Sequence, residues 1–179
     1  MREQNVGEGV LRLQHADITT LQVDAIVNAA NQSLAGGGGV DGAIHRAAGP
    51  ELMNELRTRY TGCPTGSAVI TGAHGLGARY VIHAVGPRWR DGEHGEADLL
   101  RSAYRTAFAL AAEHGCASVA APSISTGIYG FPVERAAPIA LEEARDALRG
   151  DTSLRSVTFA LFSPADLEAF AAALRILGG

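Results

Sequence analysis

The stretch NAANQSLAGGGGVDGAIH, residues 28–45, concentrates acid, imidazole, amide and glycine residues in one short segment. Four consecutive glycines, residues 36–39, stand directly before a segment whose apolar residues have helical spacing. The backbone N–H groups of such a loop can converge on a phosphate group where the helix begins. Asp41 and His45 follow four residues apart, so they share one face of that helix. The pattern predicts an anion-binding loop with acid–base chemistry beside it.

A bare glycine run has a second interpretation, which is a flexible loop without a ligand. The run lacks the Gly-Lys-Ser/Thr sequence of a Walker A loop, and its spacing differs from the dinucleotide fingerprint G-x-G-x-x-G. The placement of Asp41 and His45 on the following helix favours the binding interpretation. Asn28 and Asn31 add two amide side chains to the segment. They stand between an expected strand at residues 25–27 and the glycine run.

A second loop, Ser125–Pro132, follows an apolar segment and precedes an expected helix. Its small residues would let backbone amides approach the other side of a diphosphate. Tyr129 and Phe131 lie two residues apart, so in an extended loop both rings would point the same way, and one or both could stack on a sugar or a base. The alternative is that the rings anchor the loop in the core. Both loops leave strands at the carboxyl end, where ligands bind in α/β sheets.

Asp17 comes shortly after the first apolar run, in the sequence His-Ala-Asp-Ile-Thr. A carboxylate at this position could accept a hydrogen from the exocyclic amino group of a purine. Spacing alone favours the other interpretation, in which Asp17 caps a helix or closes a turn.

The remaining reactive residues do not suggest a second site. No histidine has the spacing of a close metal-ligand pair with another histidine or a cysteine, so we expect no metal. His83 lies in an apolar run, as a core histidine does. Cys63 has no neighbouring base that would activate its thiol, and Ser125 lacks the G-x-S-x-G frame of a hydrolase elbow.

The chain has 179 residues, of which 46% are hydrophobic and 19% are charged. This composition predicts a sizeable core and a single domain over residues 1–179. The net charge of −4 argues against a broadly basic nucleic-acid surface. No run is long enough to span a membrane, and residues 1–10 lack an apolar signal core. Since Cys63 and Cys116 stand far apart, we expect free thiols and a cytoplasmic location.

Short apolar runs alternate with alanine-rich helical patterns along the chain. The expected strands cover residues 10–13, 25–27, 67–71, 80–84, 118–121 and 156–162. The expected helices cover residues 40–48, 50–59, 97–114, 133–149 and 164–177, with Ser163 as the N-cap of the last helix. Several strands lack polar alternation, as buried strands do. Interleaved strands and helices predict an α/β domain with α/β/α layers.

Six motifs together resemble the macrodomain family. They are Ala16–Thr19, Val23–Asn31, Gly36–His45, Cys63–Gly66, Val81–Pro87 and Ser125–Pro132, and they follow the family order over nearly the whole chain. Within the family, the chain is similar to the MacroD-type ADP-ribosyl hydrolases, a group that includes O-acetyl-ADP-ribose deacetylases. Residues 73–78 depart from the pattern, because the family often has a tyrosine and a proline there, and we expect only a changed surface turn. The zinc-dependent branch is not expected, because its cysteine and histidine ligands are lacking.

The resemblance implies a three-layer α/β/α macrodomain fold, with ADP-ribose lying across the crest of a mixed central sheet. It implies that Asp17 binds the adenine amino group beside the Ile18 backbone, that Phe162 packs near adenine, and that the loop amides hold the diphosphate. The full implied binding set is Asp17, Ile18, Asn28, Gly37, Gly38, Gly39, Val40, Ser125, Thr126, Gly127, Ile128, Gly130 and Phe162.

The resemblance also implies a catalytic set of Asn31, Asp41, His45 and Tyr129, in which Asn31 and Tyr129 fix the distal ribose. The reaction would be hydrolysis at or next to the anomeric carbon of that ribose, without a metal or cofactor. A negative charge at a helix start is stabilised by about 0.3–1 kcal/mol. We therefore expect Asp41 to be ionised and to orient or activate a water, with His45 holding Asp41 or a ribose hydroxyl. A diphosphate oxygen of the substrate can share that task.

The implied partners are ADP-ribose and proteins that carry mono-ADP-ribose on Asp or Glu; ADP-ribosylated nucleic-acid ends are a further possible substrate. The alternative is a reader that binds ADP-ribose without turning it over. The presence of all four catalytic residues favours the enzyme. An RNA- or polymer-binding module is disfavoured by the net acidity and the lack of an aromatic and basic stripe. We expect no membrane partner and a monomer.

Overall fold

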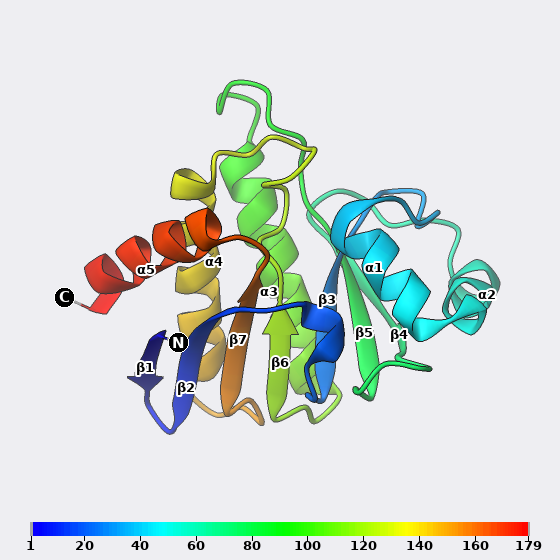
Figure 1. Ribbon diagram of the computed structural model, residues 1–179, viewed down its shortest axis with the longest axis horizontal. Coiled ribbons are helices and arrows are strands. Elements are labelled where there is room, and N and C mark those ends of the chain that lie inside the picture. The colour runs from blue at the N-terminus through cyan, green and yellow to red at the C-terminus, as the bar shows by residue number, and fades with distance from the viewer. Residues whose placement is uncertain (1, 179) are drawn as a thin grey trace.

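The computed structural model describes residues 2–178, which form one mixed sheet with helices on both faces (Figure 1). The strands are β1 (Arg2–Val6), β2 (Gly9–His15), β3 (Ala25–Ala30), β4 (Ala68–Gly72), β5 (Tyr80–Val85), β6 (Ser118–Ala121) and β7 (Ser156–Leu161). Their order across the sheet is β1-β2-β7-β6-β3-β5-β4. The inner strands β2, β7, β6, β3 and β5 are parallel, whereas β1 and β4 pair antiparallel at the two edges.

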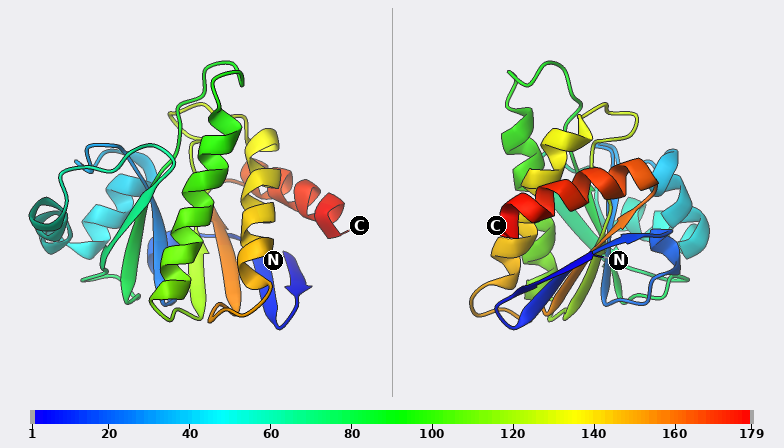
Figure 2. Two further views of the ribbon diagram at one scale, coloured as in Figure 1. Left: turned by 180° about the vertical axis from the view of Figure 1, so that it is seen from behind. Right: turned by 60° about the vertical axis from the view of Figure 1, so that its left-hand side comes forward.

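Two groups of helices cover the two faces of the sheet (Figures 1 and 2). One face carries α3 (Glu96–Glu113), α4 (Val133–Leu148) and α5 (Pro164–Gly178). The other carries α1 (Gly39–Ala48), α2 (Pro50–Arg59) and the 3₁₀ turn η1 (Ile18–Thr20). The predicted three-layer α/β/α arrangement with a mixed central sheet is confirmed. In the part of the chain that the structure describes, no helix combines the length and apolar character needed to cross a membrane.

Alternating side chains of β3 connect the two cores. Ala25 and Val27 pack under α3 and α4, whereas Ile26 packs with Ile44 and Leu52 on the side of α1 and α2. Because successive strand residues point to opposite faces, the next residue on the Ile26 side is Asn28. This alternation directs a buried amide toward α1.

The hydroxyl of Tyr104 joins the core to the loop that follows β6. Tyr104 is completely buried in α3, donates to Pro122 O at 2.9 Å and accepts from Ile124 N at 2.8 Å. Burial raises the pKa of Tyr104, so the hydroxyl remains protonated and keeps its donor role. The backbone at the start of the loop is therefore fixed from beneath.

The carboxyl ends of the five parallel strands lie along one edge, at the top of the sheet in Figure 1. In their order across the sheet, these strands lead to Asp17, Phe162, the Ser125 loop, the Asn31 loop and the segment after Val85. Neighbouring strands lie about 4.8 Å apart. The five segments therefore form one continuous row, on which an extended molecule can lie.

All expected strands and helices are present, with ends that differ by at most three residues. The sequence prediction lacked β1, because Arg2–Val6 is polar and forms an edge strand in which only Val6 is buried. The sequence signal that would have indicated this hairpin is the glycine at position 7. It begins the two-residue turn between Val6 and Gly9, where its φ is 57°. Ser163 caps α5 as expected, since its Oγ accepts from Asp166 N at 3.1 Å.

Candidate functional site

The glycine run forms the turn between β3 and α1, with Gly38 as the N-cap of the helix. Gly36 and Gly39 have φ angles of 81° and 59°, which favour glycine. Within residues 2–178, the N–H groups of residues 37–40 have no hydrogen-bond acceptor, and the first helical bond runs from Gly42 N to Gly38 O. The loop thus presents a row of free donors where the helix begins, an arrangement that attracts anions.

Asp41 lies in the first turn of α1, with a side chain that is only 8% exposed. Its Oδ1 accepts from Asn28 Nδ2 at 2.8 Å, and His45 Nε2 lies 3.4 Å from the same oxygen. A methyl group on Gly37 would lie 3.5 Å from Asp41 Oδ2 and 4.0 Å from Asn31 Nδ2. One carboxylate oxygen is therefore held, and the other faces the space between Gly37 and Asn31.

A buried chain of hydrogen bonds behind Asp41 fixes the orientation of Asn28. Thr71 Oγ1 donates to Gly72 O at 3.0 Å, so it accepts from His83 Nε2, also at 3.0 Å. His83 Nδ1 is then the acceptor that Asn28 Nδ2 approaches at 3.2 Å. This pattern turns the Asn28 nitrogen toward Asp41 and leaves the buried Asn28 Oδ1 without a partner among the described residues.

His83 is neutral in the folded protein. Burial, helped by the neighbouring His45, lowers the pKa of His83 to about 3 against a weaker opposing effect of Glu55. The ring centroids of His45 and His83 are 6.4 Å apart. The prediction of a satisfied core histidine is confirmed, and the ring also serves as the support of Asn28.

We expect His83→Gln to flatten the pH dependence of stability between about pH 5 and 6.5. The unfolded chain takes up a proton at His83 below the ordinary pKa of 6.5, whereas the folded chain does not until about pH 3. The wild-type protein therefore loses stability as the pH falls, with a contribution that approaches about 1.4 kcal/mol per pH unit. Urea unfolding at several pH values measures the two slopes. Equal slopes in both proteins would contradict this account.

Asn31 shapes the start of the glycine loop with its own side chain. Its Nδ2 donates to Gly36 O at 2.9 Å, while its Oδ1 accepts from Ser33 Oγ at 2.9 Å and Ala35 N at 3.2 Å. These bonds stabilise a turn in which Leu34 has a φ of 55°. The side chain is thereby held at the wall of the space beside Asp41.

The loop between β6 and α4 presents a second row of free amides. No acceptor among residues 2–178 binds the N–H groups of residues 125–129, whereas Gly130 N and Phe131 N close the loop on Gly127 O and Ser125 O. Ser125 has a φ of 69°, and its buried Oγ has no partner in the described chain. A strained backbone with an unpaired buried polar atom is typical of a functional site.

Gly86, at the end of β5, allows this loop to lie close to the sheet. A Cβ at Gly86 would collide with Ser125 Oγ and would lie 2.5 Å from Ile124 Cγ2. Only glycine permits this approach of the two segments. The Val81–Pro87 motif therefore sets the position of the second loop.

Tyr129 and Phe131 point to different places. Phe131 is buried and packs on Trp89 with ring centroids 4.7 Å apart, whereas Tyr129 is half-buried and lines an open cavity. Gly130, with a φ of 73°, turns the chain between them. The prediction that both rings share one side is wrong, because the loop is not extended. Phe131 anchors the loop, and Tyr129 is the ring that a ligand can reach.

Asp17 and Phe162 lie at the other end of the row. Asp17 caps η1, since its Oδ1 accepts from Thr19 N at 3.0 Å and from Thr19 Oγ1 at 2.7 Å. Its Oδ2 has no partner among residues 2–178, so the capping role leaves one oxygen for a ligand. The bond from Ala16 N to Leu161 O brings Phe162, whose side chain is 89% exposed, beside it. Ile18 buries its side chain and offers only its backbone.

The segment after β5 is held by Glu96, a role that sequence analysis did not identify. The buried Glu96 carboxylate accepts from the N–H groups of Arg90, Asp91, Gly92 and His94, at distances between 2.6 and 3.1 Å. Burial tends to raise the pKa of Glu96, but these N–H groups outweigh burial and hold the pKa far below its usual range. An acid in the first turn of a helix is too common a pattern to have revealed this contact.

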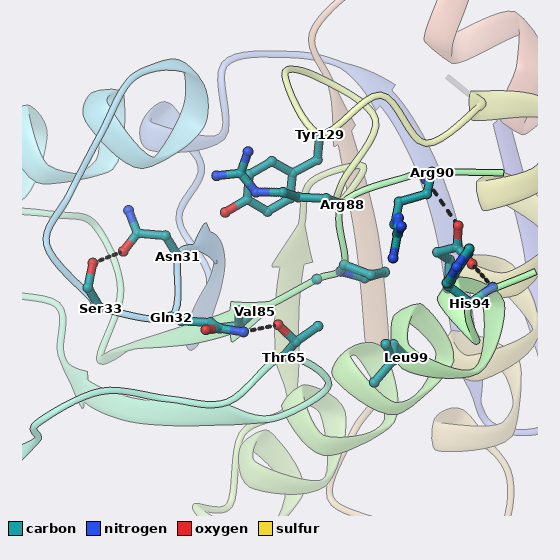
Figure 3. A pocket seen from close by; sticks show the side chains of 13 residues that line it. Asn31, Gln32, Ser33, Thr65, Val85, Arg88, Arg90, His94, Leu99 and Tyr129 are labelled. Carbon is teal, nitrogen blue, oxygen red and sulfur yellow. Dashed lines mark hydrogen bonds between the residues drawn. The ribbon is translucent and has the colours of Figure 1, made fainter. Parts of the chain in front are cut away.

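The same segment packs against the second loop. Trp89 N donates to Tyr129 O at 2.8 Å, and the guanidinium of Arg88 lies 4.7 Å above the Tyr129 ring. Figure 3 shows Arg88 and Tyr129 stacked at the mouth of a cavity of about 540 Å³. Asn31 also lines this cavity, but Asp41 and residues 37–40 do not. The cavity therefore begins at Asn31 and Tyr129 and extends away from Asp41 and the glycine loop.

Neither cysteine has the environment of a nucleophile. Cys63 and Cys116 are free and buried, and burial raises the pKa of each thiol. The prediction that both cysteines carry free thiols is confirmed.

Within residues 2–178, the ligand atoms of Asp91, His94 and Glu96 lie within 4.8 Å of one another, as metal ligands do. The spacings of histidine and cysteine in the sequence do not predict this group, because two of its three members are carboxylates. The Glu96 oxygens already accept four N–H groups, and His94 Nδ1 lies 2.8 Å from Asp91 Oδ1. The hydrogen bonds of the loop account for the cluster.

Comparison with known proteins gives consistent matches. Residues 27–140, well over half of the chain, match the family model described as Macro domain. A macro domain-containing protein of Chlorobaculum tepidum is 57% identical over 159 residues, which cover 89% of this chain and 92% of the relative. A Pantoea vagans protein named O-acetyl-ADP-ribose deacetylase 1 is 52% identical over 157 residues, covering 86% and 92%. A mutant macrodomain of Oceanobacillus iheyensis, solved with ADPR, has a TM-score of 0.91 at 40% identity, covering 98% of this chain and 97% of that one.

Proposed function

Because the chain belongs to the macro domain family, as its motifs predict, we propose that it binds ADP-ribose and hydrolyses ADP-ribosyl esters. The proposed substrates are mono-ADP-ribose on Asp or Glu side chains of proteins, and O-acetyl-ADP-ribose. The observation that carries the proposal is the geometry of Asp41. One of its oxygens is held by Asn28, and the other is open toward Gly37 and Asn31.

The row of segments along the sheet edge suits an extended nucleotide. In this proposal, the free oxygen of Asp17 and the exposed Phe162 ring take the adenine at one end. The two rows of free amides, residues 37–40 and 125–129, take the diphosphate between them. The distal ribose then lies between Asn31 and Tyr129, near Asp41. The solved relative with ADPR supports this choice of ligand.

The chemical step uses Asp41 Oδ2 as the group beside the attacking water. The carboxylate takes a proton from the water as the water oxygen bonds to the substrate. With a modified Asp or Glu, the water oxygen bonds to the anomeric carbon, the bond from that carbon to the ester oxygen breaks, and the side chain leaves as a carboxylate. With O-acetyl-ADP-ribose, the water oxygen bonds to the acetyl carbonyl carbon, the bond from that carbon to the ribose oxygen breaks, and the ribose oxygen takes up the proton while acetate is released. A positioned base typically contributes about 10²–10⁴ in rate. Asn28 and His45 keep Asp41 Oδ1 in place, and a substrate diphosphate oxygen can share the proton transfer.

The second candidate function is a reader that binds ADP-ribose without turnover. A reader needs the amide rows and Asp17, but it does not need a carboxylate whose orientation is fixed. The chain of contacts from Thr71 through His83 and Asn28 fixes that carboxylate from behind. Two relatives from Pantoea vagans are named O-acetyl-ADP-ribose deacetylases. Both points favour the hydrolase.

A panel of substrates tests the proposal. The wild-type protein is incubated with O-acetyl-ADP-ribose and with proteins that carry mono-ADP-ribose on glutamate, serine or arginine. We expect turnover of O-acetyl-ADP-ribose and of the glutamate-linked protein only, because the serine and arginine linkages are not esters. They have no carbonyl carbon for water to attack, and their leaving groups are poorer than a carboxylate. Calorimetry with ADP-ribose measures binding in parallel. Binding without any release would make the protein a reader, and release from serine or arginine would overturn the proposed ester specificity.

A further inference from the structure

The cavity beyond Asn31 and Tyr129 lies where a group attached to the distal ribose would continue. It shares these two residues with the implied catalytic set, whereas residues 37–40, residues 125–128 and Asp17 do not line it. A nucleotide that lies along the sheet edge therefore leaves this cavity for the part of the substrate that is not ADP-ribose. This inference rests on the proposed function.

The cavity is larger than a small acyl group requires. Its volume is about 540 Å³, which lies in the range of ligand pockets. A water molecule takes about 30 Å³ of liquid volume, so the three non-hydrogen atoms of an acetyl group would fill on the order of 100 Å³. Most of the cavity would stay unused with O-acetyl-ADP-ribose, and a larger acceptor would fill it.

The charges around the cavity select for an anion. Arg88 and Arg90 line it, and neither forms an ion pair with a carboxylate of residues 2–178. The lining carboxylate, Glu96, is occupied by four backbone N–H groups. On a chain with a net charge of −4, this is a locally positive hollow.

The opposite wall offers neutral hydrogen-bonding groups. Gln32 Nε2 donates to Thr65 Oγ1, and Figure 3 shows this pair to the left of Arg90, with Leu99 below Arg90. An amide, a hydroxyl and an apolar patch suit a peptide backbone with short side chains. A nucleic-acid end would instead favour several phosphate contacts and an open aromatic face, and the Tyr129 ring is already covered by Arg88.

The backbone of Arg90 and the guanidinium of Arg88 are held by neighbouring groups before any substrate binds. Glu96 holds the backbone of Arg90, while Trp89 N and the Arg88 guanidinium bind the Tyr129 backbone and ring. A site that is already ordered loses less entropy when it binds its ligand.

We propose that this cavity is an acceptor subsite, which receives an acidic peptide segment that flanks the ADP-ribosylated Asp or Glu. Arg90 attracts the flanking carboxylates, and Gln32 and Thr65 contact the peptide. The subsite gives the enzyme a preference for modified side chains in acidic sequence, in addition to its affinity for ADP-ribose.

The test compares two synthetic peptides that carry mono-ADP-ribose on one glutamate. One peptide has glutamate residues on both sides of the modified position, and the other has glutamine residues there. O-acetyl-ADP-ribose is the third substrate, and a 5′-phosphate-linked ADP-ribosyl oligonucleotide is the fourth. The variants are Arg90→Gln, whose side chain is exposed, and Arg175→Gln, an exposed control on α5.

The wild-type protein and Arg175→Gln are expected to prefer the acidic peptide over the neutral peptide by about 3- to 10-fold in kcat/KM. Arg90→Gln should lose most of this preference, and added salt should reduce it in the wild type. Turnover of O-acetyl-ADP-ribose should differ far less between the variants.

Equal use of the two peptides by the wild type, or an unchanged preference in Arg90→Gln, overturns the subsite. A stronger preference for the oligonucleotide than for the acidic peptide overturns the peptide as its occupant. Turnover of O-acetyl-ADP-ribose in these cases shows that the proposed function stands without the subsite. If the wild type turns over none of the four substrates, the proposed function itself has failed.

Discussion

Replacing Asp41 with asparagine is expected to slow the release of ADP-ribose from a modified glutamate by about 10²–10⁴-fold. Asparagine has the same shape but cannot take a proton from water. Its oxygen can still accept from Asn28 Nδ2, which donates to Asp41 Oδ1 at 2.8 Å in the wild type. The helix start and the glycine loop should therefore keep their structure, and affinity for ADP-ribose should change much less than turnover.

Single-turnover rates with a glutamate-linked protein, together with calorimetry, separate these two quantities. Asp98→Asn is the matched control, because Asp98 is an exposed acid in the first turn of α3 and loses the same charge–helix interaction. We expect the control to keep wild-type turnover. If Asp41→Asn retained more than about a tenth of the wild-type rate, the proton would be taken mainly by another group, such as a substrate phosphate oxygen.

The glycine loop and its acid could be read from the sequence because their relation is local. The helical repeat places Asp41 and His45 on one face, and the glycine run places free amides before them. The structure has both features, with His45 Nε2 3.4 Å from Asp41 Oδ1. Such local patterns need no knowledge of which strands are neighbours.

The support behind Asp41 could not be read in the same way. Asn28 and His83 are direct partners in the register of β3 and β5, and Thr71 joins them from β4 across an antiparallel pair. Sequence periodicity shows that His83 is buried, but it does not give strand order or register. The consequence is that the sequence identified the carboxylate and not the buried chain of bonds that orients it.

Glu96 and Phe131 show a related difficulty in loops. Four backbone donors converge on Glu96 because residues 90–94 fold back over the start of α3. Phe131 enters the core because Gly130 reverses the chain after Tyr129. Both outcomes depend on the path of an irregular segment, which has no periodic signal in its sequence.

The second large effect is expected from Gly127→Glu, which should weaken ADP-ribose binding by at least about 100-fold, because like charges brought together cost several kcal/mol. Gly127 is exposed and does not have a positive φ, and a Cβ there would meet no atom within 4 Å. The fold should therefore accept the side chain, and thermal unfolding should be close to that of the wild type.

The effect of charge can be separated from that of size with Gly127→Gln, which has nearly the same shape and no charge. If the amides of residues 125–129 hold a diphosphate, the glutamate variant should bind far more weakly than the glutamine variant, and added salt should narrow the difference. Equal losses in both variants would indicate that bulk alone blocks the loop. Unchanged affinity in both would place the diphosphate elsewhere, since a row of free amides that tolerates a neighbouring carboxylate is not holding an anion.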